Sequence, residues 1–539
     1  MGAAAAWAFN FMLHLADRLF LGVLAGYRAP GLPSEGGFPT EVAGPYSLWL
    51  VPLVAALGGL IVGIITWRLA PEAEGHGTDN VVRAFHRDGG RLRARLAPVK
   101  LVTSAITIGS GGSAGREGPI AMIAATLGSW YADLRRRDEH DRRLLLLVGA
   151  AAGISAIFRS PIGAALFVVE VLYADMEFEA GVLLYATLGA IVAYALGGLF
   201  SGFGALFAVP LPIAPLRSAL DYGWYVVLGV AAGLLATVMP VIFYRTRDLF
   251  RRLPVHPVAK PAIGAGLTGV LAIALPQLIG GGYGWIQRAM DGRMLLGTLL
   301  ALTIGKIVAL SLTVGSGGSG GVFAPSLYVG AMLGGAVAAA AHLPAAPFVV
   351  VGMAAVFAGS AHVPFATMMM VVEMTGGYTL LVPAAVAVML SYLVQTRLSA
   401  SLQYRSLYEA QVGSRGDSPA HHTAHLEIAL RILREKEFTD LDVGELDLVS
   451  LLRSGVPVEI GANQHMVVGV LRADSPCANT TIAASGRSMA GEGTNIVALL
   501  RGERMLAPRA DLVLEAGDRL ILIAADAGLE QLGQHLDRW

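Results

Sequence analysis

The chain has few charged residues and almost no cysteine, on which soluble and disulfide-bonded proteins depend. Only 14% of its 539 residues are charged, against about 25% in an ordinary soluble domain. A single cysteine, Cys477, excludes an internal disulfide framework and a cysteine-based metal site. Four residues are lysine and the formal net charge is zero, a balance that argues against a nucleic-acid-binding protein.

Apolar residues dominate instead, at 55% of the chain with a mean hydropathy of +0.62. A helix needs about 20 apolar residues to cross the hydrocarbon core of a bilayer, and we expect the stretch near Ala3–Leu24 to be a retained membrane helix. The segments Ile120–Trp130 and Pro364–Met374 are too short and predict half-helices that end inside the protein. Runs of nearly full length are Ser47–Trp67, Val182–Phe200, Trp224–Phe243, Pro261–Ile279 and Leu295–Leu312.

Charge is unevenly distributed along the chain. Residues 1–420 hold 28 basic against 22 acidic residues, whereas residues 421–539 hold 11 against 17. Arginines cluster in three loops, at 87–95, 135–143 and 245–252. Because basic loops of membrane proteins face the cytoplasm, we expect these loops and the acidic tail to be cytoplasmic.

Two distant halves of the chain share one plan. Segments 109–128 and 315–334 both open Gly-Ser-Gly-Gly-Ser and are identical at ten of twenty positions, and Lys100 and Lys306 each stand nine residues ahead. A second pair of matching segments brings Glu170 into correspondence with Glu373. Repeated halves with glycine- and proline-broken apolar segments predict a transport path near the middle of the membrane.

The sharpest motif is Gly115-Arg116-Glu117-Gly118-Pro119, with Gly321–Pro325 as its counterpart. Each places a proline where a helix begins, and a helix N-terminus attracts anions. Glu117 stands at the position of Phe323, and an ionisable group in a membrane is a functional candidate. It would gate the anion site and carry protons, or it would be a structural acid that pairs with Arg116 or caps the helix.

The character of the chain changes near residue 412. We expect a membrane domain at 1–412, a linker and helical connection at 413–455 and a small β-rich α+β domain at 456–539, in which Pro457 restricts its strand to a sheet edge. A linker trio, His421, His422 and His425, could bind a metal, although a solvated linker is the favoured interpretation. No cofactor or metal is expected.

The motifs resemble those of the CLC family of chloride channels and H⁺/Cl⁻ antiporters, in family order over residues 1–412. Gly115–Pro119 matches the GREGP motif, Gly321–Pro325 (GVFAP) matches GIFAP with one change, and Val372–Gly376 resembles the E-[LM]-T-G helix. The resemblance implies an all-α polytopic membrane protein with inverted repeats and broken helices, together with the small α+β domain. It also implies a homodimer in the inner membrane with one anion path per subunit.

The resemblance further implies roles for individual residues. Glu117 would be the external gate, and the backbone N–H groups of Gly118, Val322 and Phe323 would bind the anion. The family's tyrosine falls on Tyr408, with Tyr404 as a competitor.

Two departures from the family pattern affect selectivity and proton coupling. His76, in Gly75–Asp79, stands where the family has a serine, so its imidazole or the backbone would donate to the anion. Val171 occupies the internal proton-transfer position, directly after Glu170, and valine carries no proton. This favours a channel or weak H⁺ coupling, although Glu170, Glu177 or a water chain could substitute.

The tail resembles a second family, the RCK C-terminal (TrkA-C) domains, over residues 456–539, which implies a small-molecule or nucleotide effector. The expected function is chloride or similar anion transport across a bilayer, without enzymatic activity. The alternatives are an H⁺/Cl⁻ antiporter with another proton route and a fluoride transporter. An intramembrane serine protease that used Ser110 or Ser316 with His76 or His362 would leave the duplicated motif and Glu117 unexplained.

Overall fold

The computed structural model describes residues 1–35, 40–209, 219–415, 418, 420, 458–461, 464–489, 495–501, 504–506, 508–525 and 536–538. The chain divides into two compact units, Met1–Gln411 and Val412–Trp539. Most of the expected linker at 413–455, including its three histidines, lies outside the described residues.

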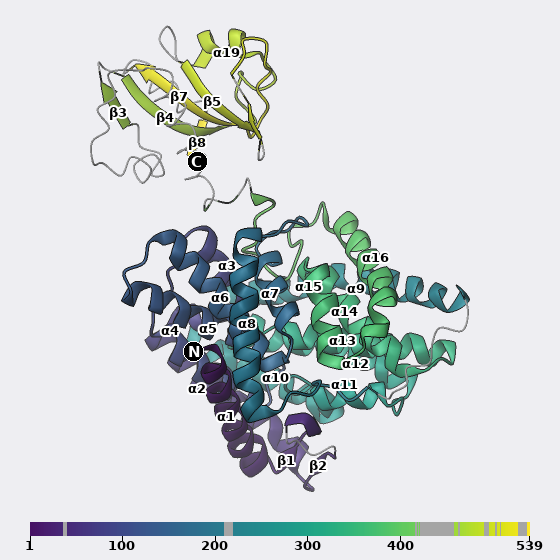
Figure 1. The fold of residues 1–539 in the computed structure, drawn as a ribbon. Coiled ribbons are helices and arrows are strands. Elements are labelled where there is room, and N and C mark those ends of the chain that lie inside the picture. Colours follow the sequence, from purple (N-terminus) through teal and green to yellow (C-terminus); the bar gives the residue numbers. More distant parts are fainter. Residues whose placement is uncertain are drawn as a thin grey trace. The chain divides into compact units, whose positions relative to one another are not determined.

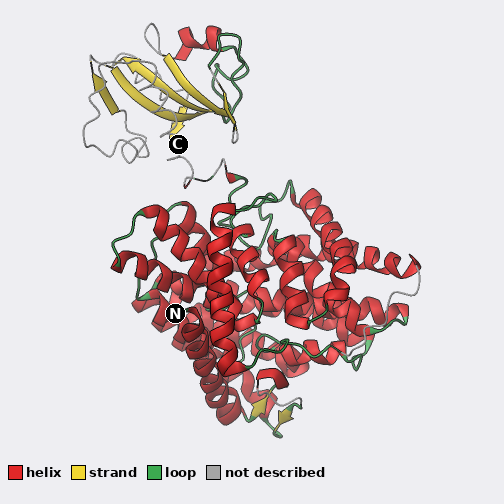
Figure 2. Cartoon of the chain, in the orientation of Figure 1, coloured by secondary structure: helices red, strands yellow, loops and turns green. Residues whose placement is uncertain are grey.

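The first unit is built almost entirely of helices (Figures 1 and 2). A short two-stranded ribbon, β1 (Tyr27–Arg28) with β2 (Val42–Ala43), follows a π-helical turn at Arg18–Ala25. The helices of the first half are α1 (Gly2–Asp17), α2 (Ser47–Leu69), α3 (Thr78–His86), α4 (Leu96–Gly109), α5 (Glu117–Leu134), α6 (Glu139–Phe158), α7 (Pro161–Glu170) and α8 (Ala180–Ser201).

The second half repeats this series. Within the described residues, eight helical segments are long and apolar enough to cross a membrane, so several of the predicted spans are confirmed. The second-half helices are α9 (Ala219–Arg252), α10 (Lys260–Ala274), α11 (Tyr283–Met290), α12 (Leu296–Gly315), α13 (Phe323–Ala341), α14 (Ala345–Ala361), α15 (Pro364–Thr375) and α16 (Leu381–Ser399).

Two expected boundaries are wrong. The run Pro261–Ile279 is not one helix, because α10 ends at Ala274 and a 3₁₀ turn begins at Pro276; a residue before proline is disfavoured in the helical conformation. The segment Ile120–Trp130 belongs to a longer helix, since α5 runs from Glu117 to Leu134. The apolar run in the sequence did not include the residues at the two ends of α5.

The duplicated glycine segments break their helices in the same way and satisfy each other. The Ser113 N–H donates to Thr313 Oγ1 at 3.0 Å, and the Ser319 N–H donates to Thr107 Oγ1 at 3.3 Å. Gly115 and Gly321 then exchange two backbone hydrogen bonds of 2.8 and 2.6 Å. Each half therefore supplies the partners that the broken backbone of the other half needs inside a membrane.

The two repeated lysines have equivalent tasks. Lys100 Nζ donates to the carbonyls of Ala73 and Gly75 at 2.9 and 2.6 Å, and Lys306 Nζ donates to the carbonyls of Leu278 and Gly280 at the same two distances. Both lysines are fully buried. They fix the glycine turns that lead into α3 and α11.

The short helices α7 and α15 cap each other. Glu170, the last residue of α7, accepts the N–H groups of Phe365 and Ala366 at 3.1 and 2.7 Å. Glu373 near the end of α15 accepts the N–H groups of Ile162 and Gly163 at 3.2 and 2.8 Å. Each carboxylate thus binds donors that a helix start leaves without an intrahelical partner.

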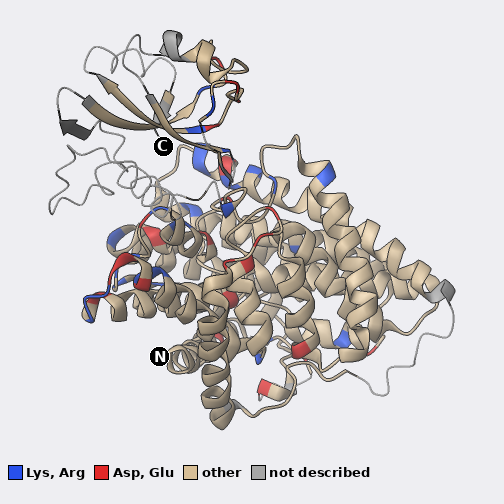
Figure 3. Cartoon of the chain, turned by 45° about the horizontal axis from the view of Figure 1, so that its top comes forward, with Lys and Arg blue, Asp and Glu red and all other residues tan. Residues whose placement is uncertain are grey.

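Charged side chains are sparse on the long helices of the first unit and gather on connecting segments, many of them toward one end (Figure 3). At the helix ends that flank the connection between α5 and α6, Arg142 pairs with Asp133 at 2.8 Å and Arg143 pairs with Glu139 at 2.6 Å. An apolar belt with charged ends is the arrangement that a bilayer requires.

The second unit contains an antiparallel sheet in the order β3-β4-β7-β5-β6, with β8 paired to β4. The strand that follows Pro457 lies at the sheet edge, as expected. Apolar side chains of β4, β5 and β7 form a core with the buried Cys477. The elements are β3 (Val458–Gly461), β4 (Gln464–Leu471), α19 (Ile482–Met489), β5 (Asn495–Arg501), β6 (Arg504–Leu506), β7 (Arg519–Ala525) and β8 (Leu536–Arg538).

Candidate functional site

A small cavity of ≈ 10 Å³ lies where the starts of α5 and α13 approach each other. That volume is about the minimum for one water-sized sphere. The Phe323 ring packs against Phe158 and Phe167 at centroid distances of 4.7 and 5.9 Å. The cavity is lined by Thr78, Glu117, Gly118, Ala121, Ile154, Phe158, Phe167, Phe323 and Tyr408.

Glu117, the first residue of α5, places its carboxylate at the start of the other repeat's helix. Its Oε2 accepts the Ala324 N–H at 3.3 Å, and its Oε1 accepts the Tyr283 hydroxyl. The side chain is 2% exposed. A Cβ on Gly115 would lie 2.2 Å from Oε2, so the first glycine of the motif leaves room for the carboxylate.

Arg116 has other partners than the neighbouring acid. Its guanidinium forms an ion pair with Glu35 and lies 4.9 Å from the centre of the Tyr283 ring, and a 3.4 Å hydrogen bond joins it to Asn10. The ion pair of Arg116 is therefore with Glu35 and not with Glu117, as the structural alternative had supposed.

Tyr408 and its competitor Tyr404 lie in different surroundings. Tyr408 is 2% exposed and lines the same small cavity as Glu117. Tyr404 donates its hydroxyl to Asp248 and stacks on Tyr244 at 4.9 Å. The structure brings Tyr408, and not Tyr404, together with Glu117.

The predicted backbone donors are distributed around the cavity. Gly118 and Phe323 line it, whereas Val322 precedes α13 as its N-cap residue and lies outside the lining. A Cβ on Gly118 would lie 2.2 Å from the carbonyl oxygen of His76. Only glycine fits at this contact, which joins α5 to the segment that carries His76.

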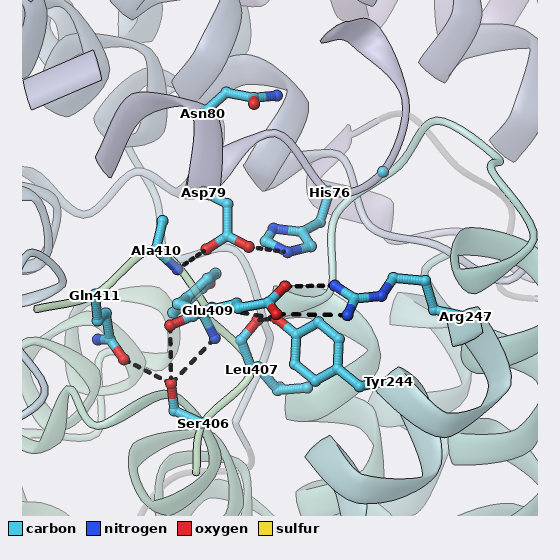
Figure 4. Close-up of polar contacts among 12 residues, drawn as sticks. His76, Asp79, Asn80, Tyr244, Arg247, Ser406, Leu407, Glu409, Ala410 and Gln411 are labelled. Carbon is cyan, nitrogen blue, oxygen red and sulfur yellow. Dashed lines mark hydrogen bonds and ion pairs between the residues drawn. The ribbon is translucent and has the colours of Figure 1, made fainter. Parts of the chain in front are cut away.

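His76 lies in a neighbouring, larger pocket of ≈ 530 Å³ bounded by segments of α2, α3, α9 and the Glu409 region. Its Nε2 is 3.1 Å from Asp79 Oδ2, and its ring centre is 5.5 Å from that of Tyr408. Figure 4 shows His76 and Asp79 together with the Arg247–Glu409 ion pair. Tyr408 thus stands between the pocket and the small cavity.

The position at which the family resemblance implies an internal proton carrier is apolar. Val171, which follows α7, is buried and lines a second cavity of ≈ 10 Å³ that shares Thr78 and Phe167 with the first. Glu170 caps α15, as described above, and does not line either cavity.

Sequence reasoning missed Tyr283, Asp79 and Glu35. The repeat could have revealed the first, because an offset of 205 aligns Gly75 and Gly77 with Gly280 and Gly282, all four at positive φ. The same offset places Tyr283 opposite Thr78. No such signal marks Glu35.

The serine candidates of the protease alternative are bonded within their own helices. Ser110 Oγ donates to the Thr107 carbonyl at 3.3 Å, and Ser316 Oγ donates to the Thr313 carbonyl at 3.0 Å. His362 is bonded to Gln395 and the Ala174 carbonyl. Neither serine contacts a histidine in these bonds.

Comparison with known proteins identifies both parts of the chain. Residues 58–396 match the family described as voltage gated chloride channel, and residues 467–537 match the TrkA-C domain. The H(+)/Cl(-) exchange transporter ClcA of Salmonella arizonae is 33% identical over 354 residues, which cover 63% of this chain and 74% of the relative. The ClcA of Klebsiella pneumoniae is equally similar, with the same coverage.

Solved structures share the fold. A slow cyanobacterial Cl⁻/H⁺ antiporter aligns with a TM-score of 0.63 at 23% identity, over 76% of this chain and 92% of the other. A CLC-type fluoride/proton antiporter gives the same TM-score and identity over 77% and 96%. The predicted fold class, helical with broken helices and a small sheet domain, is confirmed. The chain belongs to the CLC family of voltage-gated chloride channels and carries a C-terminal TrkA-C domain.

Proposed function

We propose that the protein transports chloride or a similar anion across the inner membrane, through a path gated by Glu117. The observation that carries this proposal is the position of the Glu117 carboxylate at the start of α13, where it accepts the Ala324 N–H. A carboxylate at a helix N-terminus occupies a site suited to an anion. An anion that enters must displace it.

The path would run from the 530 Å³ pocket past His76 and Tyr408 to the small cavity and then past Glu117. The backbone N–H groups at Gly118, Val322 and Phe323 would stabilise the anion with partial charges. Partial charges hold an ion without trapping it, as conduction requires. The names of the ClcA relatives, which are H(+)/Cl(-) exchangers, support chloride as the substrate.

Proton coupling is proposed to be absent or weak. Val171 and the apolar cavity beside it offer no titratable group, and Glu170 is engaged as a helix cap. An H⁺/Cl⁻ antiporter with another internal route is the second candidate, because the curated relatives are exchangers. Fluoride is the third, given the fluoride/proton antiporter among the structural neighbours.

The remaining assignments rest on the family. The protein would be a multi-pass homodimer with one path per subunit. The TrkA-C domain would lie in the cytoplasm with the connecting linker and would bind a small-molecule or nucleotide effector. The boundaries 1–412, 413–455 and 456–539 remain our proposal for the domains.

The test is flux from proteoliposomes loaded with KCl, with Cl⁻ and H⁺ recorded together in wild type and Glu117→Gln. We expect Cl⁻ efflux without uphill H⁺ movement, and a Glu117→Gln variant that changes only gating. Proton movement at a fixed ratio that Glu117→Gln abolishes would establish the antiporter instead. Competition between fluoride and chloride separates the third candidate, and no anion flux in any preparation would refute the proposal.

A further inference from the structure

One ring nitrogen in the larger pocket has a partner and the other does not. His76 is 6% exposed, and its Nε2 lies 3.1 Å from Asp79. Its Nδ1 is buried and has no hydrogen-bond partner among the described residues. Buried polar atoms are nearly always bonded, and His76 is one of the residues that line the 530 Å³ pocket, so a molecule that enters this pocket could supply the missing partner.

The surrounding backbone holds this ring in place. Asp79 Oδ1 accepts the Ala410 N–H at 3.2 Å while Oδ2 faces His76, so the carboxylate is bound on both sides (Figure 4). Lys100 fixes the Gly75 carbonyl, and the His76 carbonyl packs against Gly118. The ring therefore has little freedom to turn.

The chemistry at Nδ1 depends on the proton count of the ring. A neutral imidazole that donates Nε2–H to Asp79 presents a lone pair at Nδ1, and a lone pair repels an anion. A doubly protonated imidazolium donates from both nitrogens, and Asp79 balances its charge. Only the charged ring offers an N–H to an anion.

We propose that His76 and Asp79 form a proton-linked anion site at the inner end of the pathway, where an anion binds together with a proton. This inference rests on the proposed transport of anions. Asp79 acts as a positioning residue, because it holds the Nε2–H without touching the anion.

Several of the other charged and titratable groups around the pocket have partners of their own. From α9, Arg247 pairs with Glu409, and the Tyr244 hydroxyl donates to the Leu407 carbonyl. Tyr408 packs against the His76 ring from the side of the small cavity. Lys100 donates its hydrogen bonds to backbone carbonyls. The other charged residues that line the pocket are Glu72, Glu74, Arg83, Arg251 and Lys260. Within the part of the chain that the structure describes, Asp79 is the charged residue that forms an ion pair with the ring.

Thermodynamic linkage predicts the direction in which anion affinity changes with pH. If a proton strengthens anion binding, the anion strengthens proton binding by the same factor. Histidine changes its charge between about pH 5 and 8. Anion affinity should therefore fall as pH rises through this range, by up to roughly tenfold per pH unit for one linked proton.

The experiment is calorimetric titration of the full-length protein with chloride, in Glu117→Gln. This background removes the titration of the gate carboxylate, so any linked proton comes from elsewhere. Repeating the titration in buffers of different ionisation enthalpy counts the protons taken up per chloride. We expect tighter binding at about pH 5.5 than at about pH 7.5, with uptake approaching one proton per anion at the higher pH.

Two variants and one control locate the proton. His76→Ser keeps a hydrogen-bond donor but cannot titrate, so chloride binding should become independent of pH. Asp79→Asn should weaken chloride binding at low pH, because the neutral amide no longer balances the charge of the imidazolium. His140→Asn, at an exposed histidine on α6, should match the Glu117→Gln background.

Separate outcomes bear on the two proposals. If chloride crosses the membrane but its affinity is independent of pH in the Glu117→Gln background, or binding is undetectable there, the proton-linked site is refuted. The same holds if His76→Ser retains the linked proton. Absence of chloride flux in the wild type would instead contradict the transport function itself.

Discussion

Glu170 offers the sharpest test of how the two halves are joined, because two roles for it predict opposite results. As a helix cap it accepts two N–H groups from the start of α15. As a substitute proton carrier it would have to titrate during transport. We predict that Glu170→Gln destabilises the protein and leaves the H⁺ to Cl⁻ ratio unchanged.

The magnitude follows from the bonds that are lost. Glutamine keeps one carbonyl oxygen, so it replaces one of the two charge-assisted bonds with a neutral one and loses the other. Its NH₂ group then faces a backbone N–H at a site that is 1% exposed. A hydrogen bond to a charged group contributes about 1.5–3 kcal/mol, and we expect a loss of about that size.

The matched control is Glu373→Gln, which removes the equivalent cap of α7 in the other repeat. The Ser160 hydroxyl also donates to Glu373 at 2.5 Å, so its loss should be at least as large. Unfolding in mixed micelles gives the stability, and paired Cl⁻ and H⁺ recordings give the ratio. A Glu170→Gln protein of wild-type stability that loses H⁺ transport, while Glu373→Gln retains it, would refute the capping argument.

Three further predictions follow from single contacts. Tyr283→Phe removes the hydroxyl that donates to the Glu117 carboxylate. Since a hydrogen bond to a charged group contributes about 1.5–3 kcal/mol, the carboxylate should be displaced more easily and chloride flux should rise by roughly tenfold or more. Unchanged flux at equal expression would show that this hydrogen bond does not restrain Glu117. Lys306→Met leaves two buried carbonyls unbonded and should cost a few kcal/mol, visible as a lower thermal midpoint, with Lys260→Met as the partly exposed control. Gly118→Ala places a Cβ 2.2 Å from the His76 carbonyl and should abolish transport, while wild-type flux would show that the segment yields.

Much of the fold could be predicted because the two halves of the sequence repeat the same motifs. Spacing between the repeats was enough to match Glu117 to the start of a second helix at Phe323, and hydropathy was enough to find spans such as α2 and α12. Both signals are local in sequence or repeat at a fixed offset. Helix ends were less accurate, as at α10, where Pro276 stops the helix inside an apolar run.

The partners of the site residues could not be predicted in this way. Tyr283 meets Glu117 across 166 residues and Glu35 meets Arg116 across 81, and neither pair leaves a periodic mark. Asp79 is only three residues from His76, yet its role depends on the Ala410 N–H, which lies 331 residues away. Only tertiary packing decides such pairs.

The reciprocal bonds between the halves also constrain how the protein is made. The N–H groups of Ile162 and Gly163 reach the membrane about two hundred residues of synthesis before Glu373, their acceptor. Until then the first half carries helix starts and glycine turns whose partners do not yet exist. During synthesis, water or the insertion machinery must therefore solvate these unpaired groups of the first half. Two separately encoded halves should assemble when they are produced together, and neither half should fold when it is produced alone.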